Sequence, residues 1–258
     1  GFFKVLDKPE AMSRSISQLF LGVRIECAQC HHHPSEKWAQ DDYFALAGFF
    51  TGVQKKSGPD GEAVISQPGE DIKHPRTNKP VATRYLDGKP LLLDKMEDRR
   101  EVLADWMTSP TNPFLARAIV NRIWAHYFGR GIIEPIDDLR ITNPATNEPL
   151  IQALTAHFVQ SGFDLKSLTR VILVSSAYQL GPQTVDNASD EQNFSHAMPR
   201  SMPAEVLLDA ISQATGVPEK FNGWPEGVRA IQMWDNRMPS YFLKIFGRPG
   251  RTSVCERE

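Results

Sequence analysis

Apolar residues recur at helical spacing along most of this chain. In residues 10–25 they fall at positions 12, 16, 19, 20 and 23, which places them on one face of a helix. Residues 37–50 carry a broader apolar stripe with the same period. The same spacing predicts further helices over residues 97–109, 112–129, 147–162, 164–180 and 203–216.

Polar residues and glycines mark where several of these helices begin and end. Asn112, Asn147 and Asp164 each precede a periodic segment and are expected to cap it, since their side-chain oxygens accept hydrogen bonds from free backbone N–H groups. Gly129 follows one segment and is expected to end it. The VILV run at 171–174 is strand-like in composition, but the length of its segment and the Asp164 cap favour a helix.

Residues 52–95 break the helical pattern. They are rich in Gly, Pro, Lys and Asp, with turn signals at PDG and LDG. AVIS, 63–66, and VATRYL, 81–86, are short strand-like runs. We expect one or two hairpins that cover a face of the first helices. The predicted fold class is therefore mainly α, helical bundle-like, with a small irregular β-hairpin insertion around 52–95.

Composition and charge exclude several classes of protein. With 41% hydrophobic and 23% charged residues among 258, the chain is expected to be globular with a sizeable core. A formal net charge of −2 gives no basic excess, so we expect no nucleic-acid partner. No run of eighteen apolar residues occurs, so no transmembrane segment is expected in this stretch. Because the chain opens on Gly1, we expect a fragment of a longer protein, and the termini do not reveal its compartment.

The stretch ECAQCHHHP, residues 26–34, holds two of the three cysteines and three of the seven histidines. Cys27, Cys30 and His31 form CxxCH, the attachment pattern of c-type haem. Thiols at i and i+3 of a helical turn project to the same side, so both can reach the two vinyl groups on one edge of haem. The histidine that follows becomes an axial ligand of the iron. The motif predicts covalently bound haem c.

A metal ion without haem is the main alternative. The two cysteines of the motif with His31 or His33 supply three ligands, and Cys255 or His74 would complete a tetrahedral zinc site. A second CxxC or an HxxxH at zinc-finger spacing is missing, which weakens this alternative. A third possibility is purely structural: two buried free cysteines in a helix corner, beside a run of surface histidines.

The sequence does not identify a second axial ligand for the haem. His32 and His33 lie too close to His31 along the chain to reach the opposite face of the ring. If no other side chain binds, the iron is five-coordinate and open to small ligands. Candidates elsewhere are His74, His126, Met96, Met107, Met198, Met202 and Met238.

Residues 121–140 allow a different hypothesis, a catalytic or sugar-binding site. Aromatic rings stack on sugars, and paired carboxylates act as acid and base. We favour a structural interpretation, a helix with core aromatic residues and a turn held by Arg–Asp pairs, because adjacent carboxylates usually point to opposite sides. Residues 229–246 are ambiguous in the same way. The residues concerned are Arg122, Trp124, His126, Arg130, Asp137 and Asp138 in the first segment, and Trp234, Asp235, Asn236, Arg237 and Tyr241 in the second.

Residues 17–50, SQLFLGVRIECAQCHHHPSEKWAQDDYFALAGFF, resemble the C-terminal end of the planctomycete cytochrome-like domain family. HPRTNKPVATRYLDG resembles the linker that follows, and the sequence from DRREVLADWM to VSSAYQL resembles the start of the planctomycete-specific partner domain. The resemblance divides the chain into 1–51, the end of the cytochrome-like domain, 52–95, a linker or β insertion, and 96–258, the partner domain. His32 departs from the family pattern, which more often has Asn or Asp there.

This resemblance implies a large exported protein, periplasmic or at the cell surface, with haem at the CxxCH motif. Its partners would be a redox protein or other domains of the same chain, with a polysaccharide as a further candidate. We therefore expect a c-type haem protein in electron transfer or haem-based redox chemistry. The alternatives are a non-haem scaffold, which holds zinc or copper or binds a polysaccharide or partner, and an enzyme with its site around His126 and Asp137.

Overall fold

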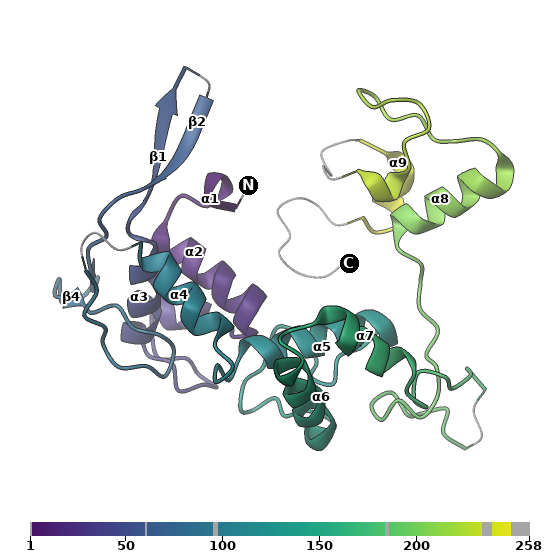
Figure 1. Ribbon diagram of the computed structural model, residues 1–258, viewed down its shortest axis with the longest axis horizontal. Coiled ribbons are helices and arrows are strands. Elements are labelled where there is room, and N and C mark those ends of the chain that lie inside the picture. The colour runs from purple at the N-terminus through teal and green to yellow at the C-terminus, as the bar shows by residue number, and fades with distance from the viewer. Residues whose placement is uncertain (1, 60, 95–97, 184–185, 234–238, 249–258) are drawn as a thin grey trace. The chain divides into compact units, whose positions relative to one another are not determined.

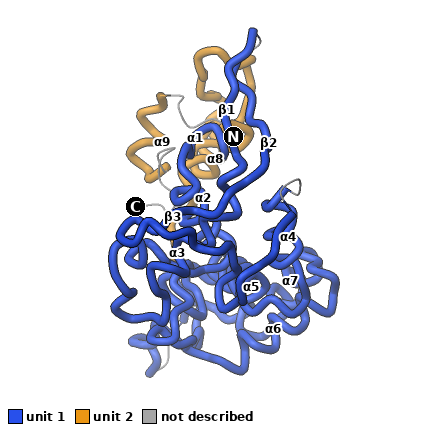
Figure 2. Tube along the Cα trace, turned by 90° about the vertical axis from the view of Figure 1, so that its left-hand side faces the viewer, with its two compact units in different colours: residues 1–198 blue, residues 199–258 orange. Residues whose placement is uncertain are grey.

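The structure is a computed structural model that describes residues 2–59, 61–94, 98–183, 186–233 and 239–248. It is mainly α-helical, with two small antiparallel strand pairs in the described ranges, as the hydrophobic pattern predicts (Figure 1). The chain divides into two compact units, residues 1–198 and 199–258 (Figure 2). Within the described ranges, no helix has both the length and the apolar character needed to cross a bilayer.

Unit 1 begins with two helices and a π-helical turn. α1 spans Phe2–Val5, α2 spans Pro9–Ile16, and the π turn η1 spans Ser17–Leu21. The helix predicted over 10–25 ends earlier, because Gly22 has a left-handed φ of 66° that closes the turn. The chain therefore leaves the helix four residues before the cysteine motif begins at Glu26.

The helix α3, Gln40–Ala47, and the 3-10 turn η3, Gly48–Phe50, lie at the centre of the first hydrophobic core. α3 begins at Gln40 rather than at Lys37, because Ala39 is extended and its N–H donates to the Asp42 carboxylate, 2.8 Å away. The predicted apolar stripe is buried along this segment. Large buried side chains of this core are Met12, Leu21, Ile25, Tyr43, Leu46, Phe49 and Phe50.

The predicted β insertion forms two hairpins. β1, Val53–Gly58, pairs with β2, Gly61–Ser66, with Val53 opposite Ser66. β3, Ile72–Lys73, pairs with β4, Pro80–Val81, and both contact α3 as expected. The AVIS strand is confirmed.

VATRYL is a strand only at its first residue, Val81. Its later backbone groups bond within a turn instead: Thr83 O accepts from Leu91 N (2.9 Å), and Tyr85 O accepts from Gly88 N (3.0 Å). Because these carbonyls already accept other hydrogen bonds, they do not pair with a neighbouring strand, and the strand ends at Val81.

Unit 1 continues with α4, Arg99–Thr108, α5, Leu115–Phe128, α6, Glu148–Gln160, and α7, Leu165–Leu173. The predicted caps are confirmed. Asn147 Oδ1 accepts from Leu150 N at 3.0 Å, and Asp164 Oδ1 accepts from Lys166 N at 2.8 Å.

The boundaries of α5 and α7 show how polar side chains set helix ends. Asn112 Oδ1 accepts from the N–H groups of Phe114 and Leu115, each at 2.9 Å, so it caps α5 as predicted. α7 ends at Leu173 rather than at 180, because the Ser175 hydroxyl donates to Ile172 O at 2.7 Å and competes with the helical hydrogen bonds.

The second core of unit 1 lies between α5, α6 and α7. Its centre is made of Trp124, Ile151, Phe158 and Leu168, all buried. At the surface, Arg117 of α5 makes a two-pronged hydrogen bond to Glu148 of α6, with both distances 2.7 Å. This hydrogen bond lowers the pKa of the Glu148 carboxyl.

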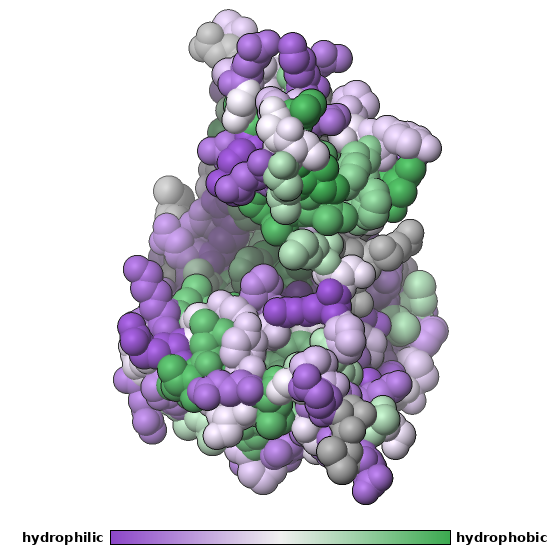
Figure 3. Space-filling model, turned by 90° about the vertical axis from the view of Figure 1, so that its right-hand side faces the viewer, coloured by the Kyte–Doolittle hydropathy of each residue, from purple (hydrophilic) through white to green (hydrophobic). Residues whose placement is uncertain are grey.

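Unit 2 is small, with α8, Ala204–Thr215, the 3-10 turn η4, Ala230–Gln232, and α9, Tyr241–Ile245. Its core contains Ala204, Leu208, Phe221, Ala230, Met233 and Leu243. So small a core leaves several large apolar side chains exposed, among them Val217, Tyr241 and Ile245. Figure 3 shows apolar side chains grouped between polar ones on the face that it draws.

Candidate functional site

The cysteine motif folds as one turn of 3-10 helix, η2, spanning Glu26–Gln29. Ile25 and Ala28 are 1% and 0% exposed and fix the turn to the first core. Cys27 and Cys30 are exposed free thiols, so the alternative of two buried cysteines in a helix corner is wrong. Cys27 lies within the turn and Cys30 is its C-cap residue, and from their i and i+3 spacing we expect both thiols to project to a similar side.

The histidines that follow the cysteines have different partners. His31 is exposed, and its Nδ1 lies 2.6 Å from His32 O. A proton on Nδ1 makes this hydrogen bond and leaves the Nε2 lone pair free to ligate a metal or haem iron. His33 Nδ1 accepts from Ser35 N at 3.2 Å, so this nitrogen is occupied within its own turn.

A loop from the second half of unit 1 holds the motif on both of its flanks. Before the motif, Leu139 N donates to Gly22 O at 2.8 Å. After the motif, Ile141 N donates to the Glu36 carboxylate at 2.6 Å. The motif loop is therefore positioned by residues more than a hundred positions away in the sequence.

A small cavity of about 80 Å³ lies between the motif loop and this second loop. Trp38 and Phe114 give it apolar walls, and His33 lines it too. Its cations are paired: Arg140 with Asp138 (3.4 Å) and Lys37 with Asp87 (2.6 Å). The cavity is far smaller than a haem, and neither Cys27 nor Cys30 lines it.

Burial and nearby charges change the acidity of a side chain behind the motif. Desolvation by burial raises the pKa of Tyr43 to about 12, and the charges of Glu10 and Glu26 add to the effect while Arg14 opposes it. The Tyr43 hydroxyl donates to Glu10 O at 3.4 Å, which joins α3 to α2. Tyr43 is therefore a neutral core residue at physiological pH.

The donor set at the motif fits covalent haem attachment. Two accessible thiols three positions apart are followed by an exposed imidazole, and these are the groups that the thioether bonds and the axial bond require. The described residues bring no three His, Cys, Asp or Glu side chains together as a metal-binding group. Cys255, the proposed fourth zinc ligand, lies outside the described residues.

Several candidates for a second axial ligand are engaged elsewhere. His74 is buried, and its Nδ1 accepts from Arg76 N at 3.1 Å and Thr77 N at 3.4 Å. Met107 packs on the first core and Met198 on the second. Met202 belongs to unit 2, and Met96 and Met238 lie outside the described residues. His126 is exposed at the surface of α5, beside Tyr127.

Residues 121–140 contain the core aromatic residue and the Arg–Asp pairs that the structural interpretation predicts. Trp124 is 3% exposed and stacks on Phe128 within the second core. Asp137 and Asp138 are buried and both form ion pairs with Arg24, so these carboxylates do not point apart as expected. Of residues 229–246, Trp234, Asp235, Asn236 and Arg237 lie outside the described residues, and Tyr241 is 82% exposed.

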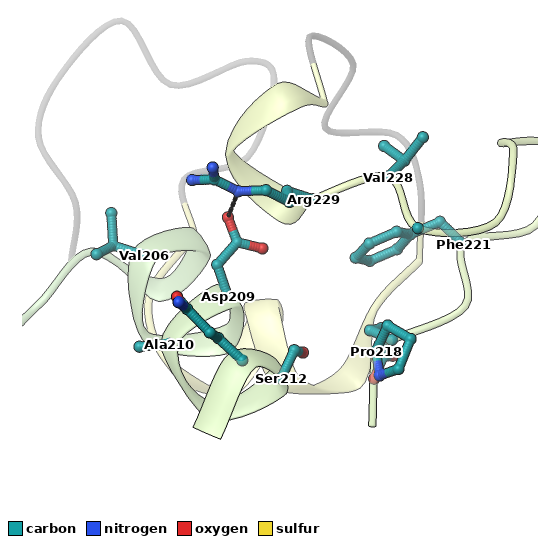
Figure 4. Close-up of a pocket in the computed structure, with 11 residues that line it drawn as sticks. Val206, Asp209, Ala210, Ser212, Pro218, Phe221, Val228 and Arg229 are labelled. Atoms are coloured by element: carbon teal, nitrogen blue, oxygen red, sulfur yellow. Dashed lines mark hydrogen bonds and ion pairs between the residues drawn. The ribbon is translucent and has the colours of Figure 1, made fainter. Parts of the chain in front are cut away.

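A larger cavity, about 500 Å³, lies within unit 2 beside α8 (Figure 4). Asp209 points into it toward Arg229, at 3.4 Å. The Asp209 carboxylate also accepts from Ala230 N at 2.7 Å and Ile231 N at 3.2 Å, so it holds the start of η4. We assign Asp209 a structural role.

Two protein-family models match parts of this chain. The model of PSD1, a protein of unknown function (DUF1553), matches residues 99–258. The chain belongs to the PSD1 family. A second model, PSCyt2, a protein of unknown function (DUF1549), matches residues 4–55. Both agree with the two planctomycete-type domains that the sequence resembles, in the expected order. No curated protein and no solved structure matches.

The cysteine motif thus lies in the PSCyt2 region, and the loop that holds it lies in the PSD1 region. Sequence reasoning expected Arg–Asp pairs within residues 121–140, and it missed that Asp137 pairs with Arg24 beside the cysteine motif. Nothing in the sequence links Arg24 to Asp137, because their pairing depends on how the two regions pack.

Proposed function

We propose that this PSD1-family chain is an exported c-type haem protein, periplasmic or at the cell surface, that takes part in electron transfer or haem-based redox chemistry. Cys27 and Cys30 would form the thioether bonds, and His31 would supply the axial nitrogen. The observation that carries the proposal is the pair of free, exposed thiols, one within a 3-10 turn and one at its C-cap, followed directly by an exposed histidine. When bound, haem would supply one-electron exchange.

The chain's own residues would position the group. Ile25 and Ala28 anchor the turn in the core, and both thiols are exposed at its surface. The hydrogen bond from His31 Nδ1 to His32 O orients the ring with Nε2 as the ligating atom. Both thiols are exposed, so we expect the attached group to be open to solvent and to partner proteins.

The test is an absorption spectrum and an intact mass of the chain, made in a host that attaches c-type haem outside the cytoplasm. We expect a Soret band and a mass gain of one haem that survives denaturation. Cys27→Ser and Cys30→Ser together should abolish both, and His31→Ala should abolish haem binding. Cys255→Ser is the matched control, because it removes a thiol outside the motif, and it should leave both signals intact.

A colourless protein of unmodified mass would refute the haem proposal. Zinc or copper found by elemental analysis, and lost in the Cys27→Ser and Cys30→Ser variant, would then assign the thiols to a metal site. Loss of that metal in Cys255→Ser would identify the fourth ligand.

A further inference from the structure

A pocket of about 520 Å³ lies at the turn between β3 and β4. Arg76, Lys79 and Arg84 line it together with one carboxylate, Asp41. Three cations therefore face one anionic group, on a chain whose formal net charge is −2. Such a local excess of positive charge favours an anionic ligand.

The turn that carries these cations is held in one conformation by a buried histidine. His74 is 8% exposed, and its ring packs against Phe44 of α3. Its Nδ1 accepts from Arg76 N and Thr77 N, so the ring proton lies on Nε2, which faces Asp41 at 3.7 Å. A hydrogen bond from Asn78 N to His74 O, 2.8 Å, closes the turn. The backbone that positions the cations is thus fixed before any ligand binds.

Two of the three cations have no carboxylate partner among the described residues. Arg76 donates from Nε to Gln40 Oε1 at 2.9 Å, a neutral acceptor that leaves the two Nη groups available. The Lys79 ammonium makes no ion pair in the described part of the chain, whereas Arg84 pairs with Asp42 at 3.0 Å. By contrast, the cations that line the two cavities described above, Arg229 in one and Arg24, Lys37 and Arg140 in the other, are all paired with carboxylates.

We propose that this pocket binds a tetrahedral oxyanion, a sulfate or phosphate group that is free or in ester linkage. A guanidinium offers a planar fork of donors that matches two oxygens of such a group, and an ammonium adds a point charge for a third. Gln40 also donates to Gln29 O of the motif turn at 2.6 Å, so it links Arg76 to η2. The proposal does not rest on haem binding.

The test is calorimetric titration of the whole chain with sodium sulfate and sodium phosphate, with sodium chloride at matched ionic strength as reference. We expect saturable binding that weakens as salt is added. The variant Arg76→Ala with Lys79→Ala should lose about tenfold or more in affinity, since it removes charge-assisted hydrogen bonds. Lys79→Ala alone breaks no hydrogen bond of its side chain seen in the structure and should lose part of that affinity. Asp41→Asn should bind several-fold more tightly.

Lys56→Ala is the matched control, because it removes one exposed positive charge from β1 and should leave the affinity unchanged. No saturable binding of either anion would overturn the proposal, and so would an equal loss in Lys56→Ala and Lys79→Ala. Glucose 6-sulfate, compared with inorganic sulfate and with glucose, distinguishes the source of the anion. Tighter binding of the ester assigns an esterified ligand, and equal binding assigns the free anion.

Discussion

Arg24 donates from its guanidinium Nε to the buried carboxylate of Asp137, 3.1 Å away and 113 positions further along the chain. The Gln18 amide donates to the other oxygen of the same carboxylate at 2.6 Å. One buried acidic group of the PSD1 region therefore holds the π turn and the segment that leads into the cysteine motif. The PSCyt2 region and the part of the PSD1 region up to residue 198 thus pack within one compact unit.

We expect the loss in free energy of unfolding to depend on which partner of this pair is replaced. Arg24→Met leaves a buried carboxylate without its cation and should lower the free energy of unfolding by about 3 kcal/mol. Asp137→Ala leaves Arg24, whose side chain is 41% exposed and can return to water, so it should cost about 1–2 kcal/mol. Urea unfolding followed by circular dichroism measures both. Equal costs, or a larger cost for Asp137→Ala, would contradict the assignment of Asp137 as the buried partner.

Gly22 is expected to be intolerant of a side chain for two separate reasons. Its φ of 66° is left-handed, and a Cβ would overlap the Leu139 side chain. Gly162 has a similar φ of 71° but faces open space, so it isolates the backbone contribution. We expect Gly162→Ala to cost about 1 kcal/mol and Gly22→Ala at least about 2 kcal/mol more, since the loop must shift. Thermal unfolding of both variants measures these losses of stability. Equal losses in Gly22→Ala and Gly162→Ala would show that the Leu139 side chain moves away freely.

Much of the fold could be predicted from local signals. Asn112, Asn147 and Asp164 cap helices as expected, because capping depends on residues within one turn. α7 ends early although the apolar pattern continues beyond it. The Ser175 hydroxyl donates to Ile172 O and competes with the helical hydrogen bonds. Of the candidate site, CxxCH could be read from spacing alone. The loop that holds the motif could not be predicted. Its contacts join residues that are far apart in the sequence and that only tertiary packing brings together.

His74 is expected to be structural rather than a haem ligand. Its Nδ1 already accepts two backbone hydrogen bonds, and its ring is buried against Phe44. We expect His74→Ala to lower the free energy of unfolding by about 1–3 kcal/mol, through the loss of these bonds. The absorption spectrum of the haem-loaded chain should stay unchanged. A shift of the Soret band in a folded His74→Ala variant would show that His74 reaches the iron.

Asp98 should make the stability of α4 depend on pH in the acidic range. The hydrogen bond from Arg100 lowers the pKa of Asp98 to about 2. Because the folded pKa lies below the unfolded value of about 3.9, the stabilisation is present above pH 4 and is lost as the pH falls toward 2. Asp98→Asn keeps a good N-cap but cannot titrate. Between pH 4 and pH 2 the wild type should lose about 1 kcal/mol more than this variant in urea unfolding, since solvent screens this partly exposed pair, and parallel losses would refute the assignment.

Tyr43 should have the opposite effect in the alkaline range. Burial raises its pKa to about 12, whereas the unfolded chain releases the same proton near pH 10. The stabilisation is therefore complete below pH 10 and is lost as the pH rises toward 12. Tyr43→Phe removes the titrating group and only a long hydrogen bond to Glu10 O, so its cost at pH 7 should be below about 1 kcal/mol.

Between pH 10 and pH 12 the wild type should lose on the order of 2 kcal/mol more than Tyr43→Phe. Tyr241→Phe is the control, because Tyr241 is 82% exposed, and its alkaline loss should equal that of the wild type. If Tyr43→Phe also loses stability at the wild-type rate, the phenol titrates as it does in the unfolded chain. The contact between α2 and α3 behind the cysteine motif would then admit water.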